Sequence, residues 1–244
     1  MAADMPVKAK APPPPPPVYD WSGAYVGFSI GGVWYDVDRY YPNLGLVALP
    51  ATTYTSSSDD VIYDFHAGWQ YQWGQVILGV EAGYSAGFKE MRSTVALPNP
   101  PFADNGAAGL TAEHKITNLF TVGPRLGFAW DRWMIYGTGG YAAATLKAQY
   151  LSTATGLTVL PAQSGATWND GWFAGVGVEY MVHKGALVDV VFGAEYQHFD
   201  VSSDRAFCFV GGCAAANFRD YDLGATGDIV RARLTIKTQG WKIF

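Results

Sequence analysis

Apolar and polar residues alternate along most of the chain after Trp21, and the alternation falls into eight segments. A period of two is typical of β-strands, because successive side chains point to opposite faces of a sheet. The predicted strands cover approximately residues 23–35, 60–73, 75–90, 112–130, 132–150, 167–183, 186–202 and 225–240. Several exceed the roughly five or six residues that are usual in soluble proteins.

The predicted connections between these strands alternate in length. Tight turns are expected at Trp73-Gly74-Gln75, Trp130-Asp131-Arg132 and His183-Lys184-Gly185. The other connections, residues 36–59, 91–111, 151–166 and 203–224, are long and rich in Ser, Thr, Pro, Gly and Ala. Short turns at one end and long loops at the other are typical of barrels that span an outer membrane.

One face of each predicted strand is apolar, while the other carries glycine and isolated charges. In the last strand Val230, Leu234 and Ile236 alternate with Arg231 and Arg233. If the apolar face pointed inward, the outer face would be mostly glycine and a poor surface for water. The pattern therefore predicts that the apolar face meets lipid and that the charged face lines a narrow lumen.

The charged positions on the inward face hold equal numbers of acids and bases, which can pair with one another. They are Glu81, Arg125, Glu179, Asp189, Glu195, Arg231, Arg233 and Lys237. An eight-stranded barrel has an interior that side chains can only just fill. We therefore predict an all-β fold: an eight-stranded antiparallel up-and-down transmembrane β-barrel with a Pro-rich N-terminal extension.

Composition agrees with a membrane barrel. The chain of 244 residues is 49% hydrophobic but only 15% charged, whereas soluble domains average roughly 25% charged residues. No apolar run is long enough for a transmembrane helix, and a net charge of -5 gives no nucleic-acid footprint. Six tryptophans near predicted strand ends are expected in interfacial girdles: Trp21, Trp69, Trp73, Trp130, Trp133 and Trp172.

The N-terminal stretch lacks the apolar core of a signal peptide and is interpreted as that of a mature or nearly mature chain. Pro12 to Pro17 are six consecutive prolines, which form a stiff polyproline II spacer. We divide the chain into a Pro-rich N-terminal segment, expected in the periplasm, over residues 1–20 and the barrel over residues 21–244. The spacer is either a plain linker or a tether to a structure beneath the membrane.

Few residues suggest site chemistry. Cys208 and Cys213 flank two glycines in "CFVGGC", which favours a loop disulfide over two free thiols. His198-Phe199-Asp200 could hold a base and its orienting acid, but no serine stands out as a nucleophile.

Two further patterns have plain structural interpretations. "GTGGYA" (Gly137, Gly139, Ala142) matches a loose dinucleotide pattern without a following helix, so it is interpreted as a strand. Asp59, Asp60, Asp200 and Asp204 are interpreted as solvated loop acids, with bound calcium or cation bridges to lipopolysaccharide as the alternative. We expect no cofactor, no metal and no enzymatic activity.

Several stretches resemble successive strands of the small OmpA-like outer-membrane proteins of alphaproteobacteria, often called outer-membrane immunogenic proteins. They are "WSGAYVGFSIGGVW", "GWQYQWGQVILGVEAGY", "TVGPRLGFAWDRWMIYGTGGYAAA", "GWFAGVGVEY" and "VFGAEYQHFD". The resemblance implies peptidoglycan attachment through an N-terminal Ala-Asp, here Ala3-Asp4. It also implies that the terminal aromatic, Phe244, is the signal for the barrel-assembly machinery.

The predicted function is a structural outer-membrane β-barrel that anchors the outer membrane, through its periplasmic N-terminal segment, to peptidoglycan and displays surface loops. Expected partners are outer-membrane lipid, lipopolysaccharide, peptidoglycan and the barrel-assembly machinery, without nucleic acid. The alternatives are a narrow porin-like channel for ions or small solutes, an outer-membrane hydrolase or acyltransferase, and a soluble ligand-binding barrel.

Overall fold

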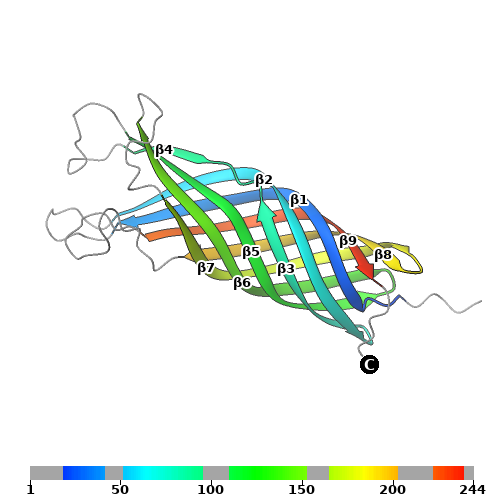
Figure 1. The fold of residues 1–244 in the computed structure, drawn as a ribbon. Coiled ribbons are helices and arrows are strands. Elements are labelled where there is room, and N and C mark those ends of the chain that lie inside the picture. The colour runs from blue at the N-terminus through cyan, green and yellow to red at the C-terminus, as the bar shows by residue number, and fades with distance from the viewer. Residues whose placement is uncertain (1–18, 42–51, 96–109, 153–164, 203–221, 239–244) are drawn as a thin grey trace, which may run out of the picture.

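The computed structural model describes residues 19–41, 52–95, 110–152, 165–202 and 222–238, which form one antiparallel β-barrel (Figure 1). Its strands are β1 (Gly23–Tyr41), β2 (Thr52–Trp73), β3 (Val76–Ala86), β4 (Met91–Val95), β5 (Leu110–Trp130), β6 (Trp133–Ser152), β7 (Gly165–Lys184), β8 (Val188–Ser202) and β9 (Asp222–Thr238). Both β3 and β4 pair with β5, so they are two stretches of one strand interrupted at residues 87–90. The predicted eight-stranded antiparallel fold is confirmed.

Backbone hydrogen bonds close the sheet into a ring. Strands that follow one another along the chain pair side by side, and β9 returns to pair with β1 from Lys237 opposite Tyr25 to Asp222 opposite Tyr40. A closed ring has no free strand edge, so the backbone needs no water to satisfy its hydrogen bonds.

No helix long and apolar enough to cross a membrane occurs among the described residues.

The short turns gather at one end of the barrel, which we call the turn end. They are residues 74–75, 131–132 and 185–187. Gly74 and Asp131 have φ angles of 63° and 54°, the left-handed values that two-residue hairpin turns require. Tyr19 and Thr238, the first and last described residues, lie at the same end, since Tyr19 bonds the turn residue Arg132 and Thr238 pairs with Val188, the first residue after a turn. Figure 1 shows the two ends of the described chain together there. The opposite end, where strands lead into segments outside the described residues, is called the loop end.

Most strands continue further toward the loop end than the sequence pattern predicts. β1 was expected to end at residue 35 but reaches Tyr41, and β2 begins at Thr52 instead of residue 60. The side-chain period continues there, but the polarity of the two faces is exchanged. Val33, Tyr35 and Val37 are buried inside, while Asp36 points outward. The pattern expected for a lipid-facing strand therefore stops before the strand does.

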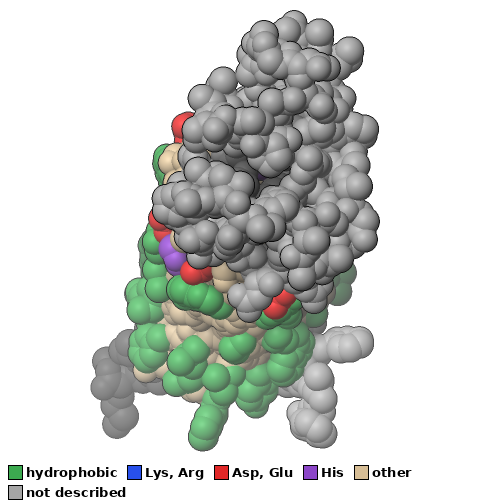
Figure 2. Space-filling view, turned by 90° about the vertical axis from the view of Figure 1, so that its left-hand side faces the viewer, with side chains coloured by type: hydrophobic (Ala, Val, Ile, Leu, Met, Phe, Trp, Pro, Cys, Tyr) green, Lys and Arg blue, Asp and Glu red, His purple; other side chains and the backbone are tan. Residues whose placement is uncertain are grey.

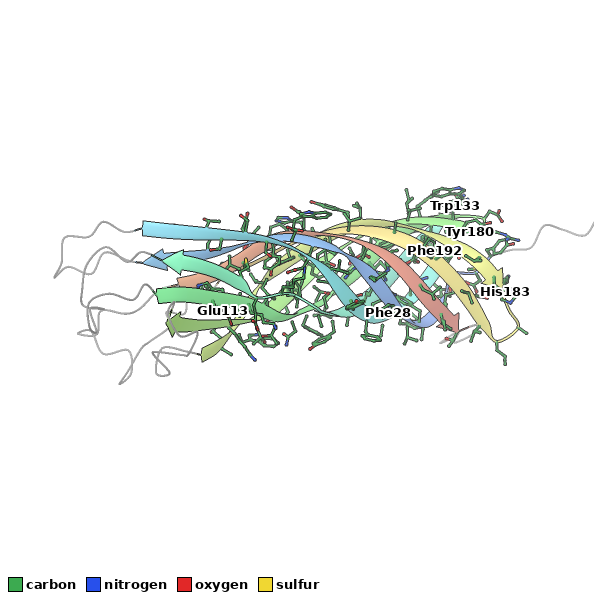
Figure 3. All side chains as sticks on the ribbon, turned by 90° about the horizontal axis from the view of Figure 1, so that it is seen from above. Phe28, Glu113, Trp133, Tyr180, His183 and Phe192 are labelled. Atoms are coloured by element: carbon green, nitrogen blue, oxygen red, sulfur yellow. The ribbon has the colours of Figure 1, made fainter. Side chains whose placement is uncertain are left out.

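Between the turn end and the strand stretches near the loop end, the outward face of the barrel is an apolar band. Its members include Val26, Phe28, Ile30, Val61, Phe65, Leu78, Val80, Leu126, Phe128, Ile135, Val176, Phe192, Leu234 and Ile236. Figure 2 shows hydrophobic side chains over the visible wall, with acidic side chains toward one edge of them. In Figure 3, Trp133 and Tyr180 project from the wall near the turn end, with ring centroids 4.7 Å apart. The band and its aromatic ends match the predicted lipid face.

One tryptophan expected in the girdle lies elsewhere. Trp21 is 0% exposed and packs inside the turn end of the barrel, so its assignment to the interfacial girdle was wrong. Trp21 precedes β1, whose strand pairing begins at Gly23, and it packs in a buried cluster with Ile77 and Met134. Trp73, Trp130, Trp133 and Trp172 are exposed on the outer face, as predicted.

The described part of the interior is filled in three layers. An apolar turn-end cluster contains Tyr19, Trp21, Ile77, Ala129, Met134, Tyr136, Met181 and Val191. A larger loop-end cluster contains Val33, Tyr35, Val37, Ile62, Phe88, Met91, Ile116, Leu119, Ala142, Ala144, Leu146, Phe173, Phe199, Val201, Leu223, Ala225 and Ile229. A layer of buried charges lies between the two clusters. The sequence pattern predicted only glycine and charges inside, and the apolar clusters were missed.

Candidate functional site in the barrel interior

All eight charged residues predicted to face inward are buried in the barrel. They come from five strands: Glu81 (β3), Arg125 (β5), Glu179 (β7), Asp189 and Glu195 (β8), and Arg231, Arg233 and Lys237 (β9). The structure divides them into a central layer of six and a separate pair at the turn end. We call the central six, together with Asp64, the interior charge layer.

Arg233 lies at the centre of the interior charge layer and is 0% exposed. Its Nη1 and Nη2 donate to the two carboxylate oxygens of Glu81 at 2.9 and 2.6 Å, a bidentate pair. Its Nη1 also donates to Glu195, and its Nε lies 3.7 Å from Oε1 of Glu179. A planar guanidinium suits this role because its donors match two carboxylates in a fixed geometry.

Arg125 joins the charge layer to the aromatic residues around it. Its Nη2 lies 2.6 Å from Oε1 of Glu179, and its Nη1 lies 3.4 Å from Oε2 of Glu81. Its guanidinium stacks over the ring of Tyr136, 3.6 Å from the centroid. Gly177 makes room for that ring, since a Cβ there would lie 2.4 Å from Cζ of Tyr136.

Arg231 completes the layer with an acid that the sequence analysis did not identify. Its Nη1 lies 3.2 Å from Oδ2 of Asp64, and Nη2 donates to Glu195 and to Oε1 of Gln197 at 2.6 Å. Beside it, His66 places Nδ1 3.4 Å from Oδ1 of Asp64 and Nε2 2.9 Å from Oγ1 of Thr235.

The inward position of the charged residues on β2 could have been predicted from the sequence. In "DVIYDFH", Asp60, Asp64 and His66 alternate with the outward Val61, Tyr63 and Phe65, so the parity of this strand alone would have placed them inside. Tyr25 and Tyr136 carried no such signal. Their hydroxyls donate to Glu81 and Glu195 at 2.9 and 2.5 Å, but buried tyrosines resemble ordinary core aromatics in a sequence.

The remaining predicted pair, Lys237 and Asp189, lies at the turn end. Nζ of Lys237 is 2.9 Å from Oδ2 of Asp189 and also donates to the backbone oxygens of Asp20 and Ser22 at 3.0 and 3.1 Å. This lysine therefore attaches the last strand to the chain just before the first strand.

Residues 19–22 form a compact structure in the mouth of the barrel, which we call the mouth clasp. Gln72 accepts a hydrogen bond from the Trp21 amide at 2.8 Å, and Gln70 donates to the Trp21 carbonyl at 2.7 Å. The Tyr19 hydroxyl accepts from Nε of Arg132 at 2.6 Å. Hydrogen bonds with Tyr180 and with Tyr19 raise the pKa of this turn arginine. The chain is thus held at the turn end by both apolar burial and hydrogen bonds.

The other candidate residues do not form a reaction site among the described residues. His198 faces outward and pairs with Asp228, with Nδ1 2.8 Å from Oδ1, rather than with Asp200. Gly137, Gly139 and Ala142 lie within β6, as the strand interpretation requires. The described residues hold no cluster of His, Cys, Asp and Glu suited to a metal ion.

The interpretation of some acids as loop residues was wrong. Asp59 and Asp60 lie in β2, where Asp60 points inward and pairs with Lys89 at 3.1 Å, and Asp200 lies in β8. The longer β2 accounts for the error at Asp59. Asp60 and Asp200 already lay at the ends of predicted strands, residues 60–73 and 186–202, and should have been assigned to them. Asp204, Cys208 and Cys213, Ala3 and Asp4, and Phe244 all lie outside the described residues.

A family model for the outer membrane protein beta-barrel domain matches residues 5–228 of the chain. The chain belongs to this family of outer-membrane β-barrels. It is 31% identical over 196 residues to the 31 kDa outer-membrane immunogenic proteins of Brucella melitensis and Brucella suis, covering 75% of this chain and 75% of each relative. The predicted resemblance and the bacterial outer membrane as its location are thereby confirmed.

Solved barrels resemble this outer-membrane barrel only distantly. Ail of Yersinia pestis, solved in complex with a heparin analogue, is 13% identical with a TM-score of 0.39, covering 87% of this chain and 99% of that one. The Escherichia coli outer-membrane protease OmpT is 9% identical with a TM-score of 0.44, covering 91% and 99%. OprG of Pseudomonas aeruginosa is 11% identical with a TM-score of 0.43, covering 88% and 96%. At these values the likeness does not extend to function.

Proposed function

We propose that this outer-membrane barrel is an envelope anchor that ties the outer membrane to peptidoglycan through residues 1–18. The observation that carries the proposal is the mouth clasp. Trp21 is buried in the turn end, and Tyr19 and Asp20 are held there by Arg132 and Lys237. Short turns face the periplasm in barrels of this kind, so the preceding residues would leave the barrel on the side of the cell wall.

The pairing of β1 supports a load-bearing role. Every residue of β1 from Gly23 to Tyr41 has a partner on β2, and most also have one on β9. A pull on the N-terminal segment would act along β1, so both ladders would have to shear at once. The mouth clasp adds resistance before the pull reaches the first ladder pair.

The sequence before the clasp suits a tether. Pro12 to Pro17 cannot enter a helix or a sheet ladder. From Asp4 to Tyr19 the chain would reach roughly 50 Å at about 3.1 Å per residue in the polyproline II conformation. Attachment at Ala3-Asp4 and assembly through Phe244 belong to the same proposal.

The filled interior favours an anchor over the alternative of a narrow channel. The loop-end cluster, the interior charge layer and the turn-end cluster follow one another along the described part of the lumen. Surface display by the segments beyond the loop end is the second part of the proposed role. It is favoured by the name of the Brucella relatives, which describes them as immunogenic.

The tether can be tested by deleting residues 5–17 in the native host. We expect the full-length protein, but not the deletion variant, to co-sediment with purified sacculi. A variant that replaces Pro12 to Pro17 with a flexible Gly-Ser segment of equal length separates spacer stiffness from attachment. Heat-modifiable gel mobility checks that each barrel is folded. Absence of the full-length protein from the sacculi would refute the tether and leave the barrel assignment intact.

A further inference from the structure

Two basic residues at the turn end lie over the same aromatic ring. Arg132 is in the turn between β5 and β6, and Lys184 is the last residue of β7. The guanidinium carbon of Arg132 lies 5.2 Å from the centroid of the Tyr19 ring, and Nζ of Lys184 lies 5.3 Å from it. Cations are attracted to the face of an aromatic ring at such distances. The mouth clasp therefore holds two positive charges close together on the rim of the barrel.

The Arg132 side chain is fixed by uncharged partners. Its Nε donates to the Tyr19 hydroxyl at 2.6 Å, and the side chain is also hydrogen-bonded with Tyr180 on β7. The backbone oxygen of Arg132 accepts from the Met181 amide at 2.8 Å. A guanidinium has five N–H donors, so these bonds orient the group without using all of its donors. Because hydroxyls carry no charge, they leave the positive charge of Arg132 available to an anion.

The two cations lie where the apolar band ends. Trp133 follows Arg132 directly, is 45% exposed on the outer face, and packs against Tyr180 with ring centroids 4.7 Å apart. Figure 3 shows both rings near the turn end of the wall. Val182, two residues before Lys184, is 53% exposed. Tryptophan and tyrosine rings at the edge of a lipid-facing band mark the depth of the headgroups, so lipid phosphates lie at the level of Arg132 and Lys184.

We propose that Arg132 and Lys184 bind the phosphate of an anionic phospholipid in the leaflet at the turn end. This is the inner leaflet, an assignment that rests on the orientation in the proposed function. Arginine pairs with phosphate oxygens in a bidentate geometry, and lysine adds a second, point-like charge. The charge of the site is thus opposite to that of its ligand. The rings of Trp133 and Tyr180 cover the glycerol and the first carbons of a chain.

The pair of cations also selects between headgroups. Phosphatidylethanolamine carries an ammonium group beside its phosphate and has no net charge. Phosphatidylglycerol has an uncharged glycerol in that place and a net negative charge. Like charges held close together repel each other, so the site should prefer phosphatidylglycerol. A bound phosphate also keeps Arg132 beside the Tyr19 hydroxyl and so supports the mouth clasp.

The test measures lipid binding to the full-length protein in a non-ionic detergent by native mass spectrometry. The probes are phosphatidylglycerol and phosphatidylethanolamine with matched chains, and we expect the wild type to bind phosphatidylglycerol about tenfold more tightly. Arg132→Gln and Lys184→Gln should each reduce the affinity for phosphatidylglycerol about threefold or more, and the double variant should lose the preference. Lys184→Gln leaves the bonds of Arg132 to both tyrosines intact, so it removes one charge without disturbing the clasp.

Lys147→Gln and Asp131→Asn are the matched controls. Lys147 is an exposed cation on β6 toward the loop end, so its variant loses a positive charge away from the site and should keep the wild-type preference. Asp131→Asn removes an acid from the same turn as Arg132, and its affinity for phosphatidylglycerol should be equal or higher. Asparagine suits the φ of 54° at this position. Heat-modifiable gel mobility checks that each variant is folded.

Equal affinity of the wild type for the two lipids, or an unchanged preference in Lys184→Gln, would overturn the proposal. Displacement of phosphatidylglycerol by an equal concentration of inorganic phosphate would also overturn it, because the cations would then hold a free anion. No sacculus takes part in this measurement, and the deletion of residues 5–17 retains Tyr19, Arg132 and Lys184. The lipid site and the tether can therefore fail independently.

Discussion

Arg233 is the residue on which the interior charge layer is centred. Removing a charge from water costs roughly several kcal/mol unless well-placed partners and hydrogen bonds offset that penalty. In this barrel one guanidinium reaches Glu81, Glu179 and Glu195. Arg233 could be placed inside from the sequence alone, because it and Arg231 alternate along β9 with the apolar residues of the outward face. Parity could not give its partners, since the residues that meet across the lumen depend on the register of strands far apart in sequence.

Replacement of Arg233 by alanine should lower the free energy of unfolding by roughly 3–5 kcal/mol, because it leaves buried carboxylates without their partner. The measurement is the temperature at which the heat-modifiable gel shift occurs. Lys115→Ala is the control, since Lys115 pairs with Glu90 at 3.4 Å near the surface and should contribute about 1 kcal/mol or less. An unchanged transition in the Arg233 variant would mean that the layer is not a structural core.

Trp21 is the main apolar contact of the mouth clasp. Trp21→Ala should cost roughly 3–5 kcal/mol, because it leaves a cavity in the turn-end cluster. Trp73→Ala is the matched control, since Trp73 is 78% exposed on the outer face and its loss should cost about 1 kcal/mol or less. Equilibrium unfolding in urea compares the two variants. Equal effects would argue against the clasp.

At the scale of the strand, β1 shows both how far the sequence pattern reaches and where it stops. From Val26 to Trp34 the outward side chains are apolar except for Gly32, and beyond them Asp36 points outward while Val37 is buried. The backbone and its parity are unchanged along the strand. The surroundings of the outer face change from lipid to water, so a search for one apolar face ended the strand six residues early.

This change of surroundings predicts a contrast between two arginine substitutions on β1. Phe28→Arg places a charge near the middle of the apolar band and should cost roughly 2–4 kcal/mol. Asp36→Arg lies beyond the band and should cost about 0–1 kcal/mol. The measurement is reversible unfolding in phospholipid vesicles. Equal costs at the two positions would mean that the apolar band does not end between Phe28 and Asp36.

At the scale of the whole molecule, the number of strands, the short turns and the inward charges could be predicted from the sequence because all three follow from local periodicity. The loop-end cluster could not, because Val33, Leu146 and Phe199 lie on strand stretches whose apolar face points inward as in a soluble protein. The mouth clasp was also missed, since Trp21 looks like an interfacial aromatic. Together these features give a barrel filled through its described length.

A filled barrel should conduct poorly. We expect the purified protein to produce no steady channels in planar lipid bilayers, because the two apolar clusters enclose the interior charge layer. A known open porin in the same membrane shows that the assay detects pores. Stable, reproducible conductance steps from the folded barrel would favour the channel and weaken the anchor.

We propose that the N-terminal segment joins this barrel to the cell wall. The most direct measurement is mass spectrometry of peptides released from sacculi of the native host after detergent extraction. We expect the sacculus fraction to contain peptides from residues 3–18. Sacculi without these peptides, with the whole protein recovered in the detergent extract, would contradict it.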